Sequence, residues 1–222
     1  MKTRRLALLV SCLLVAIATQ SYAQVTKSGP AYKVRMAWRK GDVFKYRLSL
    51  SITMPDGQTM PNNSDLTIKV ISVKDGIADV EVESIDPITK APVKKKAQMD
   101  AYGPIGEDSG MSGLSGQRLP KNPIKLGESW TISQTVKQGN ISVEVKSTYT
   151  LRTVKAFEGV NCAIFDVKAT TTKGFVSDSS GTIYLESKNG QMYRLDSLTK
   201  MTMGTGAKAQ TIMSKTSVSR IQ

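Results

Sequence analysis

The stretch that decides the fold is GPIGEDSGMSGLSGQRLPKNPIKLGESW, which occupies residues 103–130. Five glycines fall between residues 103 and 116, and two prolines follow at positions 120 and 123. Neither residue type sustains a helix or a central strand, because glycine frees the backbone and proline removes a hydrogen-bond donor. We therefore predict that this stretch separates two β-rich halves.

Apolar and polar residues alternate on both sides of this break, as expected for strands with one buried face. The longest strict alternation before the break has its apolar residues at Phe44, Tyr46, Leu48, Leu50, Ile52 and Met54. Between Leu66 and Val73 the apolar positions change from even to odd, as a β-bulge produces. Asp75-Gly76 and Lys188-Asn189-Gly190 are typical of hairpin turns.

This pattern contains ten to twelve strands and no convincing amphipathic helix, so we predict an all-β antiparallel fold. Two architectures fit: a strongly curved sheet forming an open half-barrel, which we favour, and a two-sheet β-sandwich. Residues 41–46 parallel 127–132, and residues 67–77 parallel 150–160. An internal duplication and the repetitive composition of strands explain this similarity equally well.

Residues 1–23 are typical of a secretory signal peptide. A charged start is followed by the apolar run Leu6–Ala18 and by a small-x-small site that ends at Ala23. The alternative is a lipoprotein processing box that ends at Cys12. Cleavage after Ala23 leaves one β-rich domain over residues 24–222, with halves at about 31–99 and 119–222 joined by a Gly-rich break at 100–118. We expect the mature protein to be periplasmic or extracellular, without a transmembrane span.

Three stretches carry a resemblance to known proteins: GDVFKYR at 41–47, LPKNPIKLGESW at 119–130 and GTIYL at 181–185. A proline-containing lead, a Gly-acidic-x-Trp strand start and a late strand pair resemble a broad group of uncharacterised bacterial secreted all-β proteins. The resemblance spans most of the mature chain and implies no particular activity. More remotely, the chain is similar to the LolA- and LppX-like periplasmic lipid carriers. That similarity implies a curved open sheet around an apolar cavity.

The composition argues against most catalytic chemistry. The chain has no histidine, which removes Ser-His-Asp and Cys-His systems and histidine-zinc sites. Cys162 is the one cysteine after the signal peptide, and its apolar surroundings predict a core residue. Ser197-x-x-Lys200 has the spelling of a penicillin-interacting enzyme, but in a strand these two residues point to opposite faces. We expect a non-enzymatic protein without a cofactor or metal.

Two candidate binding sites follow from the side chains. Leu195, Met201 and Met203 are candidates for binding an apolar small molecule or lipid, since methionine lines adaptable apolar pockets and also fills irregular cores. Lys90, Lys94, Lys95 and Lys96 form the densest basic cluster of a chain with net charge +13. They are candidates for binding an anionic envelope polymer or lipid headgroups. Nucleic acid fits less well, because no aromatic-interleaved basic motif appears. We therefore predict an exported binding or envelope-associated protein, with an apolar ligand in the curved sheet or, alternatively, an anionic partner on a basic face.

Overall fold

The structure is a computed structural model that describes residues 24–85, 91–105, 118–138, 141–171, 176–203 and 210–221. The predicted signal peptide, Lys90 and residues 106–117 of the break lie outside the described residues. Fourteen strands make up the regular structure of this described part. They are β1 (Val25–Ser28), β2 (Ala31–Val34), β3 (Val43–Thr53), β4 (Thr59–Lys74), β5 (Ile77–Ile85), β6 (Pro92–Asp100), β7 (Gly103–Ile105), β8 (Ile124–Lys125), β9 (Ser129–Gln138), β10 (Ile141–Phe157), β11 (Val160–Thr171), β12 (Val176–Glu186), β13 (Met192–Met203) and β14 (Gln210–Ile221).

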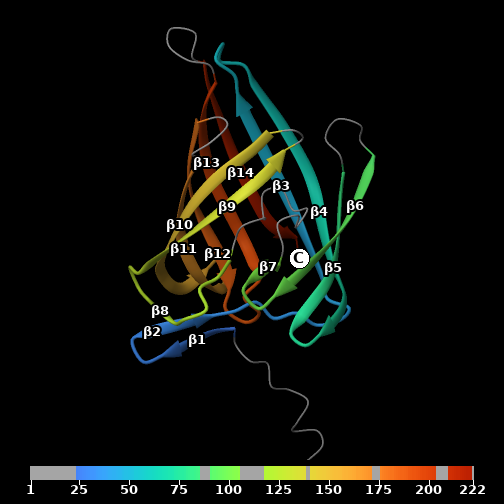
Figure 1. The fold of residues 1–222 in the computed structure, drawn as a ribbon, viewed down its shortest axis with the longest axis vertical. Coiled ribbons are helices and arrows are strands. Elements are labelled where there is room, and N and C mark those ends of the chain that lie inside the picture. Colours follow the sequence, from blue (N-terminus) through green and yellow to red (C-terminus); the bar gives the residue numbers. More distant parts are fainter. Residues whose placement is uncertain are drawn as a thin grey trace, which may run out of the picture.

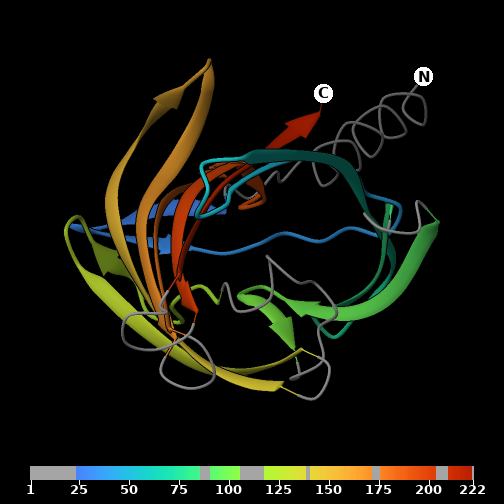
Figure 2. The ribbon, with the colours of Figure 1, turned by 90° about the horizontal axis from the view of Figure 1, so that it is seen from above.

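Eleven strands form one antiparallel sheet in the order β7-β6-β5-β4-β3-β14-β13-β12-β11-β10-β9. Its two end strands, β7 and β9, are not paired with each other, so the sheet is open. Seen from above, the sheet curves around an interior (Figure 2). This confirms the predicted all-β fold and its curved, open antiparallel sheet. Pairing of β14 with β3 joins the two sequence halves into this one sheet.

A small second sheet closes one end of the curve. Strands β1, β2 and β8 pair in the order β1-β2-β8 and lie across the lower end of the main sheet (Figure 1). Their buried residues Val25, Val34 and Ile124 join the same core cluster as the main sheet. We call β1, β2 and β8, with residues 35–40 and 118–120, the floor. The sequence analysis began the first β-rich half at about residue 31, and the structure corrects this because strand β1 lies before it.

The strand registers put the alternating apolar residues on the concave side of the sheet. In β3, Phe44 and Tyr46 are 4% and 2% exposed, whereas Lys45 and Arg47, which alternate with them, are exposed. Residues that lie opposite each other in paired strands have side chains on the same face. Phe44 therefore shares the concave face with the buried Ile68 of β4, which lies opposite it. The predicted parity change in β4 is confirmed as a bulge, where the register with β5 shifts between residues 70 and 72.

The two halves repeat the same local geometry. In each half a glycine with positive φ donates its N–H to the strand residue directly before a bulge, over 2.9 Å at Gly41 and 2.8 Å at Gly127. The hairpin that follows places an acidic residue at φ 50° in both halves, at Asp75 and at Glu158. By this match β3, β4 and β5 correspond to β9, β10 and β11.

Two strand boundaries differ from the sequence expectation. Strand β4 begins at Thr59, before the apolar positions that the sequence analysis identified between Leu66 and Val73, so it also includes the polar residues Asn62, Asn63 and Ser64. The register explains this, because Asn62 and Ser64 lie opposite Leu50 and Leu48 of the long strand β3. The expected break also contains the short strands β7 and β8.

Candidate functional site: the concave face

The concave face changes from packed to partly exposed along the strands. Near the floor its residues are buried, with Phe165, Ile183 and Val218 at 2%, 4% and 6% exposed. Further along, Leu50 and Ile52 of β3 are only partly buried. At the far end of β4, Met60 lies opposite Ile52 and is 51% exposed. The apolar core therefore fills the end of the curve next to the floor, while the apolar side chains farther from it reach solvent.

Small hydroxyl residues occupy the middle of this face. Registers across β12, β13 and β14 place Ser179, Thr199 and Ser214 in one row, and Ser179 and Thr199 join by a hydroxyl hydrogen bond of 2.8 Å. The next row toward the floor contains Gly181 and Ser197. These side chains are short, so they contribute little volume to the concave side of the central strands.

The concave side of the main sheet carries almost no charge. By strand parity, only Lys95 and Arg220 among the charged residues of the described strands lie on this side. Arg220 lies at the floor end, where it pairs with Glu186 at 2.6 Å and lies 5.3 Å from the Phe44 ring centroid. At the floor end the carboxylates of Glu186 and Asp100 are paired with Arg220 and Arg118. Farther from the floor, strand parity places the described carboxylates of the main sheet on the convex side.

An apolar pocket lies between the floor and the concave face. Its volume is about 270 Å³, open solvent included, which is below the range of about 300–1,000 Å³ that is usual for small-molecule sites. Its lining comes from both layers: Met36, Arg118, Leu119, Trp130, Tyr149, Phe165, Ile183 and Leu185. We therefore treat it as the deep end of the concave face rather than as a complete site.

Residues 118–120 connect the two sides of the opening next to this pocket. Arg118 donates to the Asp100 carboxylate at 2.7 Å and to the carbonyl oxygen of Pro104 at 2.6 Å, which ties it to β6 and β7. On the other side, the Trp130 indole N–H donates to the carbonyl oxygen of Arg118 at 2.9 Å, which ties it to β9. The Trp38 indole N–H also donates to the carbonyl oxygen of Asp100, at 2.8 Å. We call Arg118, together with its partners Asp100, Pro104 and Trp130, the clasp.

The structure places two of the three predicted apolar candidates, Leu195 and Met201, on the concave side of β13. Leu195 lies opposite Ile183 and Val218, and Met201 lies opposite Ser177 and Ile212. Both Leu195 and Met201 are partly buried. The third candidate, Met203, ends β13, and its side chain is outside the described part.

The basic cluster, in contrast, is divided between two faces. Lys94 and Lys96 lie on the convex side of β6, and Lys95 lies on the concave side, opposite Val82. Lys94 pairs with Glu83 at 2.5 Å and with Glu81 at 3.4 Å. Hydrogen bonds from Lys69 and Lys94 lower the pKa of Glu83 to about 2. These carboxylates offset part of the positive charge that the sequence suggested.

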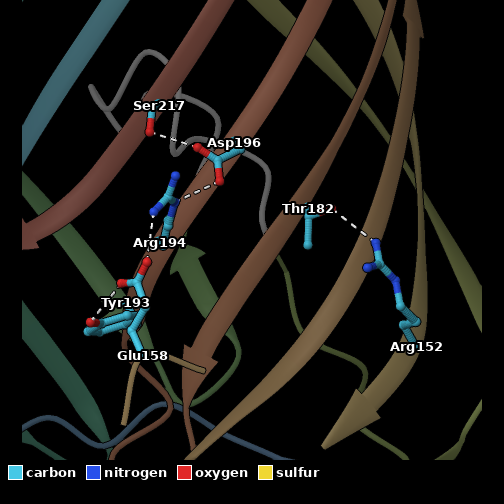
Figure 3. Close-up of polar contacts among 7 residues, drawn as sticks. All are labelled: Arg152, Glu158, Thr182, Tyr193, Arg194, Asp196 and Ser217. Carbon is cyan, nitrogen blue, oxygen red and sulfur yellow. Dashed lines mark hydrogen bonds and ion pairs between the residues drawn. The ribbon is translucent and has the colours of Figure 1, made fainter. Parts of the chain in front are cut away.

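Several charged residues on the convex face of the second half satisfy one another (Figure 3). Arg194 donates to Asp196 at 2.7 Å and to Glu158 at 3.1 Å, and the Ser217 hydroxyl donates to Asp196 at 2.7 Å. Arg152 likewise pairs with Asp166. Since these donors already have acceptors, we interpret the network as stabilising the sheet.

The remaining chemical candidates also have structural positions. Cys162 is fully buried, and burial, with Glu186 and Glu158 nearby, raises the pKa of its thiol to about 11. Ser197 lies on the concave side and Lys200 on the convex side, so they do not form a joint site. Across the described ranges, no group of three or more His, Cys, Asp or Glu side chains could hold a metal ion. Nor does this part of the chain contain a helix that is long and apolar enough to cross a membrane.

The sequence analysis did not single out several residues of the concave face. Leu50 and Ile52 were recognised only as strand residues, and Trp130 only as a strand start. Their parity was visible in the sequence, but their neighbours depend on the register between β14 and β3, whose paired residues lie more than 150 positions apart. No protein-family model matches the chain, and no curated protein matches it.

Proposed function

We propose that this protein binds an elongated apolar ligand, such as a lipid acyl chain, along the concave face of its sheet. The observation that carries the proposal is the gradient of burial on that face. Apolar side chains continue beyond the packed core and stay partly exposed at Leu50, Ile52 and Met201. Contact with a ligand would remove this apolar surface from water, which contributes about 25 cal/mol per Å².

The charge distribution supports the same ligand class. A carboxylate next to an alkyl chain loses hydration without gaining a partner, which is costly. Away from the floor end, strand parity places no described carboxylate of the main sheet on the concave side, whereas the convex side of β5 carries Asp79, Glu81 and Glu83. The pocket at the floor, with Trp130 and Phe165 in its lining, offers an apolar end for the chain.

A binding role in an exported compartment is part of the proposal. It combines the signal peptide predicted for residues 1–23 with the concave apolar face. The fold also has the curved open sheet that the resemblance to periplasmic lipid carriers implies.

The test uses two methionines on opposite faces of adjacent strands. Met201→Gln changes the concave side, and Met213→Gln changes the convex side, where Met213 is 42% exposed and lies opposite Lys200. Binding of N-phenyl-1-naphthylamine, an uncharged apolar probe, is measured by fluorescence titration. We expect Met201→Gln to weaken binding about fivefold, which corresponds to roughly 1 kcal/mol, and Met213→Gln to leave it unchanged.

Thermal unfolding of both variants provides the control for the fold. Equal binding by the two variants at similar melting temperatures would contradict the proposal. A second pair on β13, Leu195→Asn and Leu198→Asn, repeats the comparison, because Leu198 lies on the convex side and is 45% exposed.

We also propose, as a second candidate, binding of an anionic polymer or lipid headgroup through the lysines of β6. The specific observation is that Lys95 and Lys96 are exposed and form no ion pair within the described residues. Exposed charges interact weakly and are screened over about 8 Å at physiological salt. Retention on vesicles with acidic lipid should therefore fall steeply as sodium chloride increases. Replacing Lys94, Lys95 and Lys96 with glutamine should remove most of it, and unchanged retention would exclude this candidate.

A further inference from the structure

The convex side of the second half carries a group of four exposed lysines at the end farthest from the floor. The registers of β10 to β14 place them in two adjacent rows across these strands. The row nearer the floor contains Lys168 and Lys215, and the next row contains Lys146 and Lys200. Within the described residues none of the four forms an ion pair. We call Lys146, Lys168, Lys200 and Lys215 the lysine patch.

The acidic residues of this face do not neutralise the patch. The row next to it on the floor side contains Asp166 and Asp196, and an arginine pairs with each of them. Farther from the floor, Asp178 and Glu144 are the carboxylates on the convex side of the described residues of β10 to β14. Four lysines against two carboxylates leave an excess of positive charge at this end of the sheet.

Exposed apolar side chains lie among these lysines. Leu198 lies opposite Lys215 and is 45% exposed, and Met213 lies opposite Lys200 and is 42% exposed. In the row beyond, Val176 is 62% exposed. Lysines with apolar side chains between them are complementary to an acidic bilayer, because the ammonium groups meet anionic head groups and the apolar side chains reach the boundary of the acyl region.

We propose that the lysine patch, with Leu198 and Met213, docks the protein on a membrane that contains acidic lipid. The patch extends from β10 to β14, and four inter-strand spacings of about 4.8 Å give it a width of about 19 Å. A water-soluble polyanion would contact only the lysines. A bilayer also removes the two apolar side chains from water, which favours a membrane as the partner.

Docking through this surface is independent of the proposed ligand site. The patch and Met201 lie on opposite faces of the same strands, since Met201 is on the concave side of β13 and Lys200 is on its convex side. The concave face therefore stays uncovered when the convex face contacts a bilayer. The lysines of β6 belong to another part of the sheet, eight strands away from β10 in the strand order.

The test measures partitioning onto vesicles of phosphatidylcholine and phosphatidylglycerol by co-sedimentation. Each lysine close to an anionic bilayer strengthens partitioning about fivefold. Replacing the whole lysine patch with glutamine should therefore weaken partitioning by at least about 50-fold. The matched control removes the same charge from the floor and should bind like the wild type, because salt screens remote charges over about 8 Å. It replaces four floor lysines with glutamine: Lys27, Lys33, Lys40 and Lys125.

A second variant distinguishes a membrane from a polyanion. Leu198→Asn combined with Met213→Gln should weaken partitioning onto the vesicles about fivefold, and it should leave binding to dextran sulfate unchanged. Unchanged vesicle binding by this variant would overturn the proposal, because the partner would then be a polyanion.

Three other results would also overturn the proposal. They are a wild type that does not bind the acidic vesicles, equal binding by the patch variant and the floor variant, and a loss of binding that occurs only when the lysines of β6 are replaced. Titration of the patch variant with N-phenyl-1-naphthylamine keeps the two proposals separate. Probe binding should equal that of the wild type, since the concave face is unchanged.

Discussion

The closure of the floor against the main sheet makes a quantitative prediction at Gly190. This residue has φ +68°, and a Cβ atom added there would lie 1.7 Å from the carbonyl oxygen of Arg35. Two hydrogen bonds beside Gly190 show that the hairpin between β12 and β13 packs directly against residues 35–40 of the floor. The Ala37 N–H donates to the carbonyl oxygen of Asn189 at 2.8 Å, and the Gln191 amide donates to that of Ala37 at 2.9 Å.

Gly190→Ala therefore combines two costs. A left-handed backbone conformation costs a non-glycine residue about 1–2 kcal/mol, and forcing backbone apart in a packed region costs about 1–3 kcal/mol more. We expect a loss of about 3 kcal/mol in the free energy of unfolding. For a domain of this size, that loss lowers the melting temperature by about 6–12 °C.

Gly57→Ala separates the two costs. Gly57 has φ +85°, and an added Cβ would meet nothing within 4 Å, so only the backbone cost of about 1 kcal/mol applies. Urea unfolding followed by tryptophan fluorescence measures both variants. An equal loss of stability in Gly190→Ala and Gly57→Ala would contradict the close packing of Gly190 against Arg35. It would also contradict the packing of the floor against the main sheet.

Three further predictions address individual contacts. The folded-state pKa of Glu83, about 2, lies below its usual 4.5, so its ionised form contributes stability that is present above about pH 4.5 and is lost as the pH falls toward 2. The melting-temperature difference between the wild type and Glu83→Gln should therefore shrink from pH 7 to pH 2, and a constant difference would contradict the pairing with Lys69 and Lys94. The thiol of Cys162 should resist Ellman's reagent at pH 8 in the folded protein and react fully in 6 M guanidinium, because it is buried and its pKa is raised to about 11; rapid reaction of the native protein would disprove its burial. Arg118→Gln should destabilise the protein by about 1–2 kcal/mol, since it removes the ion pair with Asp100 at a partly buried site, and a loss within ±0.5 kcal/mol would show that the clasp does not contribute to stability.

For the long strands of the main sheet, the sequence was sufficient to identify each strand and to show which of its side chains are buried. Period-2 alternation identified the buried residues of β3, and the parity change between residues 66 and 73 identified the bulge of β4. These features are local, because a strand residue's face depends only on its immediate neighbours and on the bulges between them.

The floor could not be predicted in the same way. Strand β2 pairs with β8 at Ala31 and Lys125, almost a hundred residues apart, and β8 has only two residues. Such short strands carry no periodic signal, and tertiary contacts determine their conformation. The polar start of β4 has the same cause, since pairing with β3 overrides the low strand preference of Asn62 and Asn63.

The candidate site was predictable in part. The side of β13 that carries Leu195 and Met201 follows from alternation, and so does the separation of Lys95 from Lys94 and Lys96. The gradient of burial did not follow from the sequence, because it depends on where the floor meets the sheet. The clasp also required the structure, since Arg118 contacts residues on three separate strands.

Quenching of tryptophan fluorescence by a brominated fatty acid tests the central claim most directly. Trp130 lines the pocket at the deep end of the concave face. Trp38 lies near this pocket, and its indole N–H donates to the carbonyl oxygen of Asp100. Our account predicts saturable quenching at one ligand per protein, reversed by the same fatty acid without bromine and weakened in Met201→Gln but not in Met213→Gln. Quenching that does not saturate, or that the unbrominated fatty acid does not reverse, would contradict binding of an apolar chain inside the curved sheet.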